Sequence, residues 1–191
     1  MANLPLDTEL LDRAILFAVR AHAGTERRGK GYPYIIHPLE AVSIVATMTT
    51  DQELLAATAL HDTVEDTDVT LEQIRAEFGD RVASLVALES DSFEEGVPEE
   101  ISWHARKQAA IDRIRRSGPD GKMVALGDKL SNMRAIARDY ARQGDALWAL
   151  FHEKRRSEHA WHYRGLADAL RDLEGTFAFE EFERLIDQVF A

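Results

Sequence analysis

The chain has 191 residues and no cysteine, and its 34 Asp and Glu residues outnumber its 23 Lys and Arg residues, which gives a formal net charge of −11. The lack of cysteine excludes disulfide bonds, thiolate zinc sites and a cysteine nucleophile. An acidic chain lacks the broad basic surface that holds nucleic-acid phosphates, so we expect no nucleic-acid partner. An anionic substrate would need a local patch whose charge opposes the overall one.

Membrane insertion and secretion are not expected either. No apolar run approaches the roughly 18 residues that span a bilayer, and residues 1–12 lack the basic and apolar regions of a signal peptide. We therefore expect a cytoplasmic protein with no membrane partner. The composition, 45% hydrophobic and 30% charged, is that of an ordinary globular protein, and the length predicts one domain over residues 1–191.

Apolar residues recur at steps of three and four along the chain, which is the spacing of amphipathic helices. In chain order we expect helices over residues 6–21, 38–45, 54–60, 71–78, 82–86, 101–116, 123–136, 146–173 and 177–190. Pro38 suits the first position of its helix, with His37 just outside it, and Thr70 with Gln73 predicts a capping box for the short fourth helix. We interpret the acidic segment 89–100 as a mobile loop. The alternating pattern of strands is absent, so the expected fold class is all-α.

The dipeptide His61-Asp62 follows a predicted helix, and Glu65 and Asp66 each lie four residues after one of its members. Imidazole with carboxylate is a ligand set that suits Mn²⁺, Fe²⁺ or Zn²⁺. If the helix continues for one turn, each acid shares a face with a candidate ligand, and a carboxylate that does not bind the ion can move a proton. Taken alone, such a dipeptide is more often a helix end followed by a solvated acidic loop.

Two further residues extend this set. His37 lies beside Pro38 at a helix start, where a histidine is more often a cap or a packed side chain than a ligand. Asp128 lies on the flank of a largely apolar helix, where a buried charge needs a partner. Asn132 lies one turn further on the same face, and its alternative interpretation is a surface amide.

Together, these residues look like the H…HD…D metal-binding signature of the HD-domain phosphohydrolases. The flanking motifs resemble the RelA/SpoT-type (p)ppGpp hydrolase domain, and they are Ala21–Gly24 with Arg28, Pro33–Pro38, Ala59–Thr67, Phe78–Val86 and Leu126–Arg134. The resemblance implies a single HD-domain helical bundle, with its motif core at residues 10–138 and C-terminal helices over 145–191.

The resemblance also implies a role for each matching residue. One divalent ion, usually manganese in that family with Fe²⁺ or Zn²⁺ as alternatives, would be held by His37, His61, Asp62 and Asp128. Glu65 and Asp66 would orient or deprotonate the attacking water. The substrate would be contacted by Arg28 at the guanine, by Asn132 at the sugar-phosphate and by Tyr163, although for Tyr163 we slightly prefer a core aromatic.

The basic loop that holds Arg27, Arg28 and Lys30 has two interpretations. It lies about ten residues before His37 in the sequence, so its charges could offset those of a phosphoryl group during transfer. A solvated loop is an equally common role for such a cluster.

The expected function is that of a metal-dependent (p)ppGpp 3′-pyrophosphohydrolase, similar to the small stand-alone alarmone hydrolases of the stringent response. Two alternatives stay open: an HD-domain phosphohydrolase of another nucleotide, such as a nucleoside monophosphate or a dinucleotide cofactor, and a regulatory module that binds a nucleotide or metal without turnover. The substrate is open because the family usually has Asp-Gly-Val-Thr-Lys where this chain has Ala87-Leu88-Glu89-Ser90-Asp91.

Overall fold

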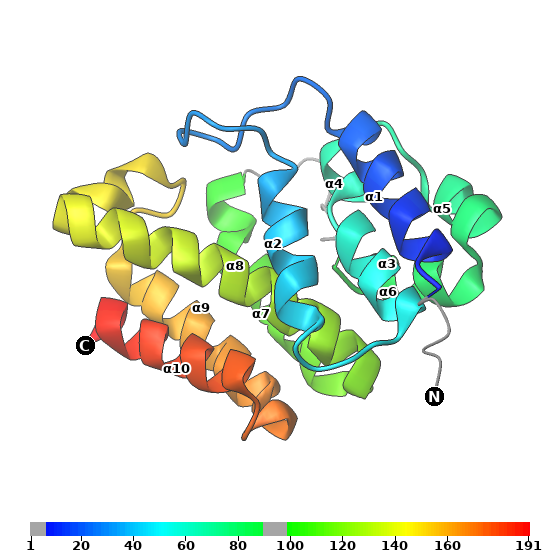
Figure 1. The fold of residues 1–191 in the computed structure, drawn as a ribbon. Coiled ribbons are helices and arrows are strands. Elements are labelled where there is room, and N and C mark those ends of the chain that lie inside the picture. The colour runs from blue at the N-terminus through cyan, green and yellow to red at the C-terminus, as the bar shows by residue number, and fades with distance from the viewer. Residues whose placement is uncertain (1–6, 90–98) are drawn as a thin grey trace. The chain divides into compact units, whose positions relative to one another are not determined.

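The structure is a computed structural model that describes residues 7–89 and 99–191, with side chains from residue 103 onward in the second segment. It divides into two compact units, residues 1–90 and 91–191, and each unit is described by itself. None of the described residues lies in a strand, and an isolated bridge joins Glu26 to Pro33. The prediction of an all-α fold is therefore confirmed (Figure 1).

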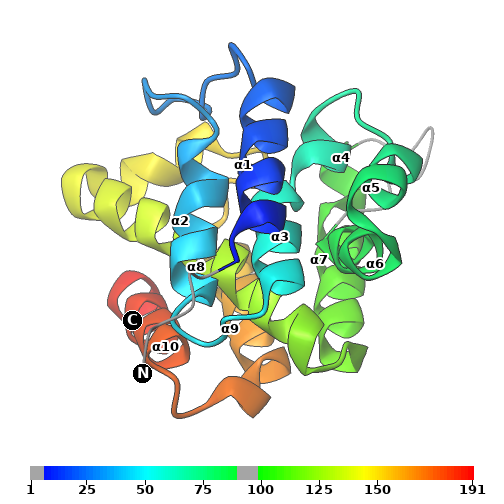
Figure 2. The same ribbon diagram turned by 45° about the vertical axis from the view of Figure 1, so that its right-hand side comes forward.

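The first unit is built around a buried helix, α3. Its elements are α1 (Glu9–Ala21), α2 (Ile36–Val45), α3 (Gln52–Leu60), α4 (Thr63–Asp66), α5 (Leu71–Phe78) and α6 (Asp80–Glu89). Helix α3 packs against α1, α2 and α6 (Figure 2), and its residues from Leu54 to Leu60 are all buried. The side chain of Asp51 caps it by accepting hydrogen bonds from two backbone N–H groups of its first turn. This packing holds the C-terminal end of α3, where His61 lies, in a fixed position.

The second unit consists of longer helices. It contains α7 (Glu99–Arg116), α8 (Pro119–Gln143), the 3₁₀ segment η1 (Gly144–Leu150), α9 (Arg156–Ala169), the 3₁₀ turn η2 (Arg171–Leu173) and α10 (Phe177–Phe190). Helix α9 packs against both α7 and α10, and α10 also packs against α8. The side chain of Thr176 caps α10 by accepting a hydrogen bond from the backbone N–H of Phe179. Helix α8 begins with Pro119, whose missing N–H is not needed in a first turn.

Several local predictions are confirmed. The capping box of Thr70 and Gln73 is formed at the start of α5, and α10 has the predicted bounds. Gly79 ends α5 with a φ of +90°, a conformation that L side chains rarely adopt.

The placement of His37 outside its helix is wrong. Helix α2 begins at Ile36, so His37 and Pro38 both lie in its first turn. The turn starts earlier because the backbone N–H groups of Ile36 and His37 donate to the carbonyls of Pro33 and Tyr34. The ring of Pro38 is accommodated because the N–H groups of a first turn have no intrahelical acceptor.

The long helix over residues 146–173 is also wrong. Residues 144–150 form η1, Phe151 is extended, and α9 begins only at Arg156. The Glu153 carboxylate accepts hydrogen bonds from the backbone and side chain of Arg155, which stabilises the break before α9. In the acidic segment, Glu89 ends α6 and residues 99–100 belong to α7, while the rest of the predicted loop lies outside the described residues.

Candidate functional site

A narrow loop of the first unit leads from α1 into the residues of the candidate site. The backbone N–H of Arg27 donates to the carbonyl of Tyr32 at 2.9 Å, and the backbone N–H of Gly31 donates to the Glu26 carboxylate at 2.8 Å. These contacts fold the segment back on itself before it enters α2. Tyr34 and His37 are thereby placed at the end of the loop and in the first turn of α2.

Three ligand atoms converge at this point. The Nε2 atoms of His37 and His61 lie 3.3 Å apart, and Oδ2 of Asp62 lies 3.3 Å from the first and 3.0 Å from the second. Both imidazoles are buried. Two ligand atoms that bind one ion at about 2.1 Å and at right angles lie roughly 3 Å apart. The chemistry and the spacing of these atoms therefore fit one divalent cation.

The tautomer of His61 is set by the backbone. Its Nδ1 lies 2.8 Å from the carbonyl oxygen of Thr58. A carbonyl only accepts hydrogen bonds, so Nδ1 carries a proton, and Nε2 is the ring nitrogen that faces the cluster. A hydrogen bond of this kind behind the ring orients an imidazole for metal binding.

Asp62 is held as a carboxylate. Burial raises the pKa of Asp62, but the charges and hydrogen bonds of His61 and His37 outweigh this and hold it well below its ordinary value. The hydroxyl of Tyr34 donates to Asp62 Oδ2 at 2.8 Å. Burial, followed by the negative charge of Asp62, raises the pKa of Tyr34, so the phenol stays protonated and remains a donor.

The ring of Tyr34 is itself held between two side chains. The imidazole of His22 stacks on it with centroids 4.8 Å apart, and the guanidinium carbon of Arg27 lies 5.1 Å from the ring centroid. His22 is buried, and neither of its ring nitrogens has a hydrogen-bond partner among residues 7–89 and 99–191. Its burial lowers its pKa, which keeps it neutral at pH 7. The role of Tyr34 was missed in the sequence, although its place three residues before His37 on a helical turn was a usable signal.

Glu65 and Asp66 lie in the short turn that follows the cluster. Helix α3 ends at Leu60, and α4 continues the helical spacing because the backbone N–H of Asp66 donates to the carbonyl of Asp62 at 2.9 Å. Both acids are exposed, whereas Asp62 is mostly buried. This turn therefore presents two carboxylates to solvent directly after a ligand candidate.

The basic loop residues are placed differently from one another. Arg28 is exposed and Lys30 is half-buried, while the neighbouring Arg27 packs over Tyr34. A role of Arg28 and Lys30 in substrate binding stays a prediction.

The remaining predicted residues lie in the second unit. On α8, the side-chain amide of Asn132 donates to one oxygen of the Asp128 carboxylate, and the ammonium of Lys129 donates to the other. Asp128 thus has the partners that a buried charge requires. Tyr163 is buried and packs on Phe182 and Phe190 with centroids 6.2 and 6.0 Å apart, as a core aromatic would.

Comparison with protein families matches residues 14–156 to the HD domain. The chain is 33% identical over 177 residues to the guanosine-3′,5′-bis(diphosphate) 3′-pyrophosphohydrolase MESH1 of Mus musculus, covering 91% of this chain and 89% of the relative. It is 34% identical over 162 residues to the protein of that activity from Aquifex aeolicus, covering 82% of this chain and 20% of the relative. The chain thus spans about a fifth of the length of that relative.

Two solved structures have a similar fold. One, described as a metazoan ortholog of SpoT that hydrolyzes ppGpp, superposes with a TM-score of 0.77 at 22% identity and covers 97% of this chain and 98% of its own. The other, a Listeria monocytogenes protein, has a TM-score of 0.72 at 30% identity over 85% of this chain and all of its own.

None of the described helices is long and apolar enough to cross a bilayer.

Proposed function

The chain belongs to the HD-domain family of metal-dependent hydrolases, and we propose that it releases pyrophosphate from the 3′ position of (p)ppGpp, leaving GDP or GTP. The observation that carries this proposal is the convergence of two imidazole nitrogens and one carboxylate oxygen at the His61-Asp62 dipeptide. The names of the relatives give the substrate class. A cytoplasmic location and a nucleotide as the only partner are parts of the same proposal.

The family implies a divalent metal, and we assign Mn²⁺ to the cluster, with His37, His61, Asp62 and Asp128 as its ligands. The first three residues are supported by their mutual distances. Asp128 is supported by the family signature and by the two donors that orient its carboxylate. The assignment requires that the two units form one HD domain, and the family match over residues 14–156 spans both of them.

The side chains then have separate tasks. A bound divalent cation stabilises charge on a phosphoryl oxygen and lowers the pKa of a nearby water. Glu65 and Asp66 orient that water, and one of the two carboxylates takes its proton as its oxygen bonds to the phosphorus at the 3′ position. The bond from this phosphorus to the 3′ oxygen breaks, and that oxygen then gains a proton. Arg28 and Lys30 offset the phosphate charge, and Asn132 contacts the sugar-phosphate.

The substrate is tested by incubating the Mn²⁺-loaded protein with ppGpp and separating the products by ion-exchange chromatography. We expect GDP and pyrophosphate in equal amounts. If ppGpp stays intact while another nucleotide in a panel is cleaved, the second candidate holds, a hydrolase of a different nucleotide. The chain sequence Ala87-Leu88-Glu89 favours that candidate, because it replaces part of the usual family motif.

The ligand assignment is tested by Asp62→Ala. We expect the variant to lose its bound metal, measured by elemental analysis, while its circular dichroism stays helical. Asp68→Ala is the matched control, because Asp68 is an exposed carboxylate just beyond α4. Metal retained in Asp62→Ala, or lost equally from both variants, contradicts the assignment.

A further inference from the structure

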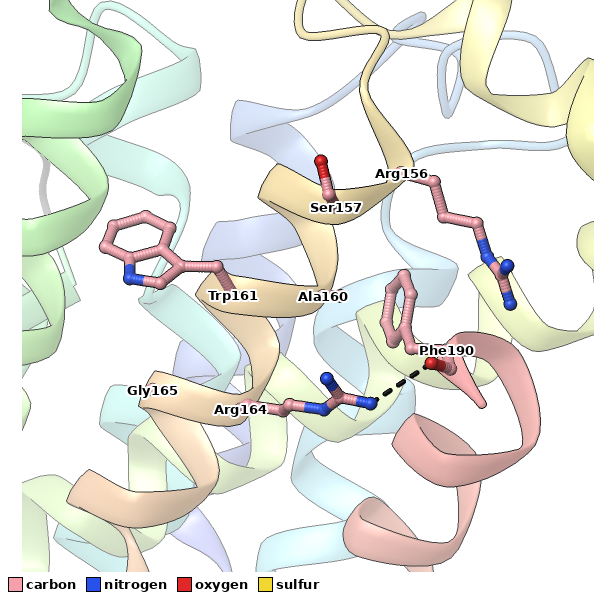
Figure 3. A pocket seen from close by; sticks show the side chains of 7 residues that line it. All are labelled: Arg156, Ser157, Ala160, Trp161, Arg164, Gly165 and Phe190. Atoms are coloured by element: carbon pink, nitrogen blue, oxygen red, sulfur yellow. Dashed lines mark hydrogen bonds between the residues drawn. The ribbon is translucent and has the colours of Figure 1, made fainter.

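A pocket of about 830 Å³ opens along α9 in the second unit. It follows one face of the helix from Arg156 to Gly165, and Phe190 at the end of α10 lines it as well (Figure 3). Trp161 and Phe190 lie on either side of this face, and the side chain of Arg164 extends between them. None of the lining residues belongs to the metal cluster or to the residues assigned to the nucleotide above.

Two guanidinium groups line the pocket, and among the described residues neither has an acidic side chain closer than 4.0 Å. Arg164 donates one hydrogen bond, at 3.1 Å, to the carbonyl of Phe190, which leaves most of its five N–H donors unused. Arg156 donates to the carbonyl of Val189 in α10 at 2.6 Å and to a main-chain oxygen of Ala191 at 3.0 Å. The carboxylate paired with it belongs to the exposed Asp145, 4.0 Å away. Main-chain oxygens thus orient both side chains, and the Arg164 charge has no acidic partner among the described residues.

The other polar groups of the pocket are also donors. The indole N–H of Trp161 and the hydroxyl of Ser157 have no hydrogen-bond partner among the described residues. Within the described part of the chain no carboxylate lines the pocket, although the chain carries 34 acidic residues. This arrangement selects a ligand that accepts hydrogen bonds and carries negative charge.

The aromatic groups add a second requirement. One side of Trp161 is held by the imidazole of His104, with centroids 3.9 Å apart and planes 16° apart. The Phe190 ring is fixed by stacking on Trp148 at 5.6 Å. Rigid rings of this kind favour a ligand with a flat apolar surface. A volume of about 830 Å³ lies in the range of small-molecule sites, roughly 300–1,000 Å³.

We propose that this pocket binds a mononucleotide, with its phosphate on Arg156 and Arg164 and its base against Trp161, independently of the metal cluster. The binding is tested by calorimetric titration of the full-length protein with GMP in the presence of a chelator, so that neither metal nor turnover contributes. We expect one GMP bound per chain, and about tenfold or greater weakening in Arg164→Gln and in Trp161→Leu. Guanosine and inorganic phosphate, each lacking half of the ligand, should both bind more weakly than GMP.

The control is Arg155→Gln, which removes the same charge one residue before the pocket, where the guanidinium is paired with Glu153 at 2.7 Å. It should bind GMP within about twofold of the parent protein. If Arg164→Gln is poorly folded by circular dichroism, Arg164→Lys replaces it, because it keeps the charge but loses the planar donor geometry. GMP affinity that is unchanged in both pocket variants, or lowered equally in Arg155→Gln, overturns the proposal.

The test of GMP binding at the α9 pocket can fail independently of the test of (p)ppGpp hydrolysis. We expect Arg164→Gln to hydrolyse (p)ppGpp at the parental rate, and a loss of GMP binding in parallel with a loss of turnover would place the nucleotide at the metal cluster instead.

Discussion

The hydroxyl of Tyr34 offers a direct test of how the cluster is held together. In Tyr34→Phe, the ring contacts with His22 and Arg27 are kept, and one hydrogen bond to Asp62 Oδ2, 2.8 Å long, is removed. The acceptor is ionised and its side chain is only 15% exposed. Hydrogen bonds to charged groups contribute about 1.5–3 kcal/mol. Because His37 and His61 still contact Asp62, we use the lower end of this range.

A loss of about 1.5 kcal/mol in metal-binding free energy corresponds to about tenfold in Kd. The measurement is a calorimetric Mn²⁺ titration of the variant and its parent at one pH, with thermal unfolding recorded in parallel. Tyr32→Phe is the matched control, because it removes the same hydroxyl two residues earlier, where no hydrogen bond is made to it within the described segments.

Two results would refute the reasoning about Tyr34. Unchanged Mn²⁺ affinity would show that Asp62 needs no orientation by the phenol. Tighter binding would show that the phenol competes with the ion for Oδ2 rather than orienting the carboxylate.

Three further changes test the base, the packing of α9 and a buried imidazole. Glu65→Gln should lower turnover by about 10²-fold or more with metal content unchanged. Undiminished turnover would show that Glu65 does not take the proton of the attacking water. Gly165→Ala brings a Cβ within 2.7 Å of Ile111 Cδ1. Because overpacking costs about 1–3 kcal/mol, the thermal midpoint of unfolding should fall. The fall should be smaller in an Ile111→Val background, where the Cδ1 atom is absent. Burial lowers the pKa of His159, so as pH falls below about 6.5 the imidazole of the unfolded chain binds a proton before that of the folded chain. Urea unfolding should therefore show a free energy of unfolding that falls from pH 7.5 to 5.5 by up to about 1.4 kcal/mol per pH unit. The fall should be less steep in His159→Gln.

The sequence predicted what depends on local spacing. The capping box at Thr70, the α10 helix and the turn that carries Glu65 and Asp66 each depend on residues within four positions of one another. The break between η1 and α9 was missed because 3₁₀ turns keep nearly the same apolar spacing as an α-helix.

Contacts between distant positions could not be predicted in this way. Tyr34 and Asp62 are 28 residues apart, and nothing in either segment alone shows that a loop tyrosine ends beside a helix terminus. The same holds for the α9 pocket, where Arg164 contacts the carbonyl of Phe190, 26 residues further on. The ligand set itself was predicted from a family resemblance, and the His61-Asp62 dipeptide taken alone favoured a solvated helix end.

The net charge of −11 therefore says little about which small anions the protein can bind. Several acids are paired within the fold, as Arg81 is with Asp51 and Glu53, and Arg134 with Glu181. A ligand responds to the charges that line its site rather than to their sum over the chain. The basic loop before α2 and the carboxylate-free pocket on α9 are both places where the local charge opposes the total. An acidic chain can thus offer sites for phosphate while its remaining surface repels polyanions such as nucleic acid.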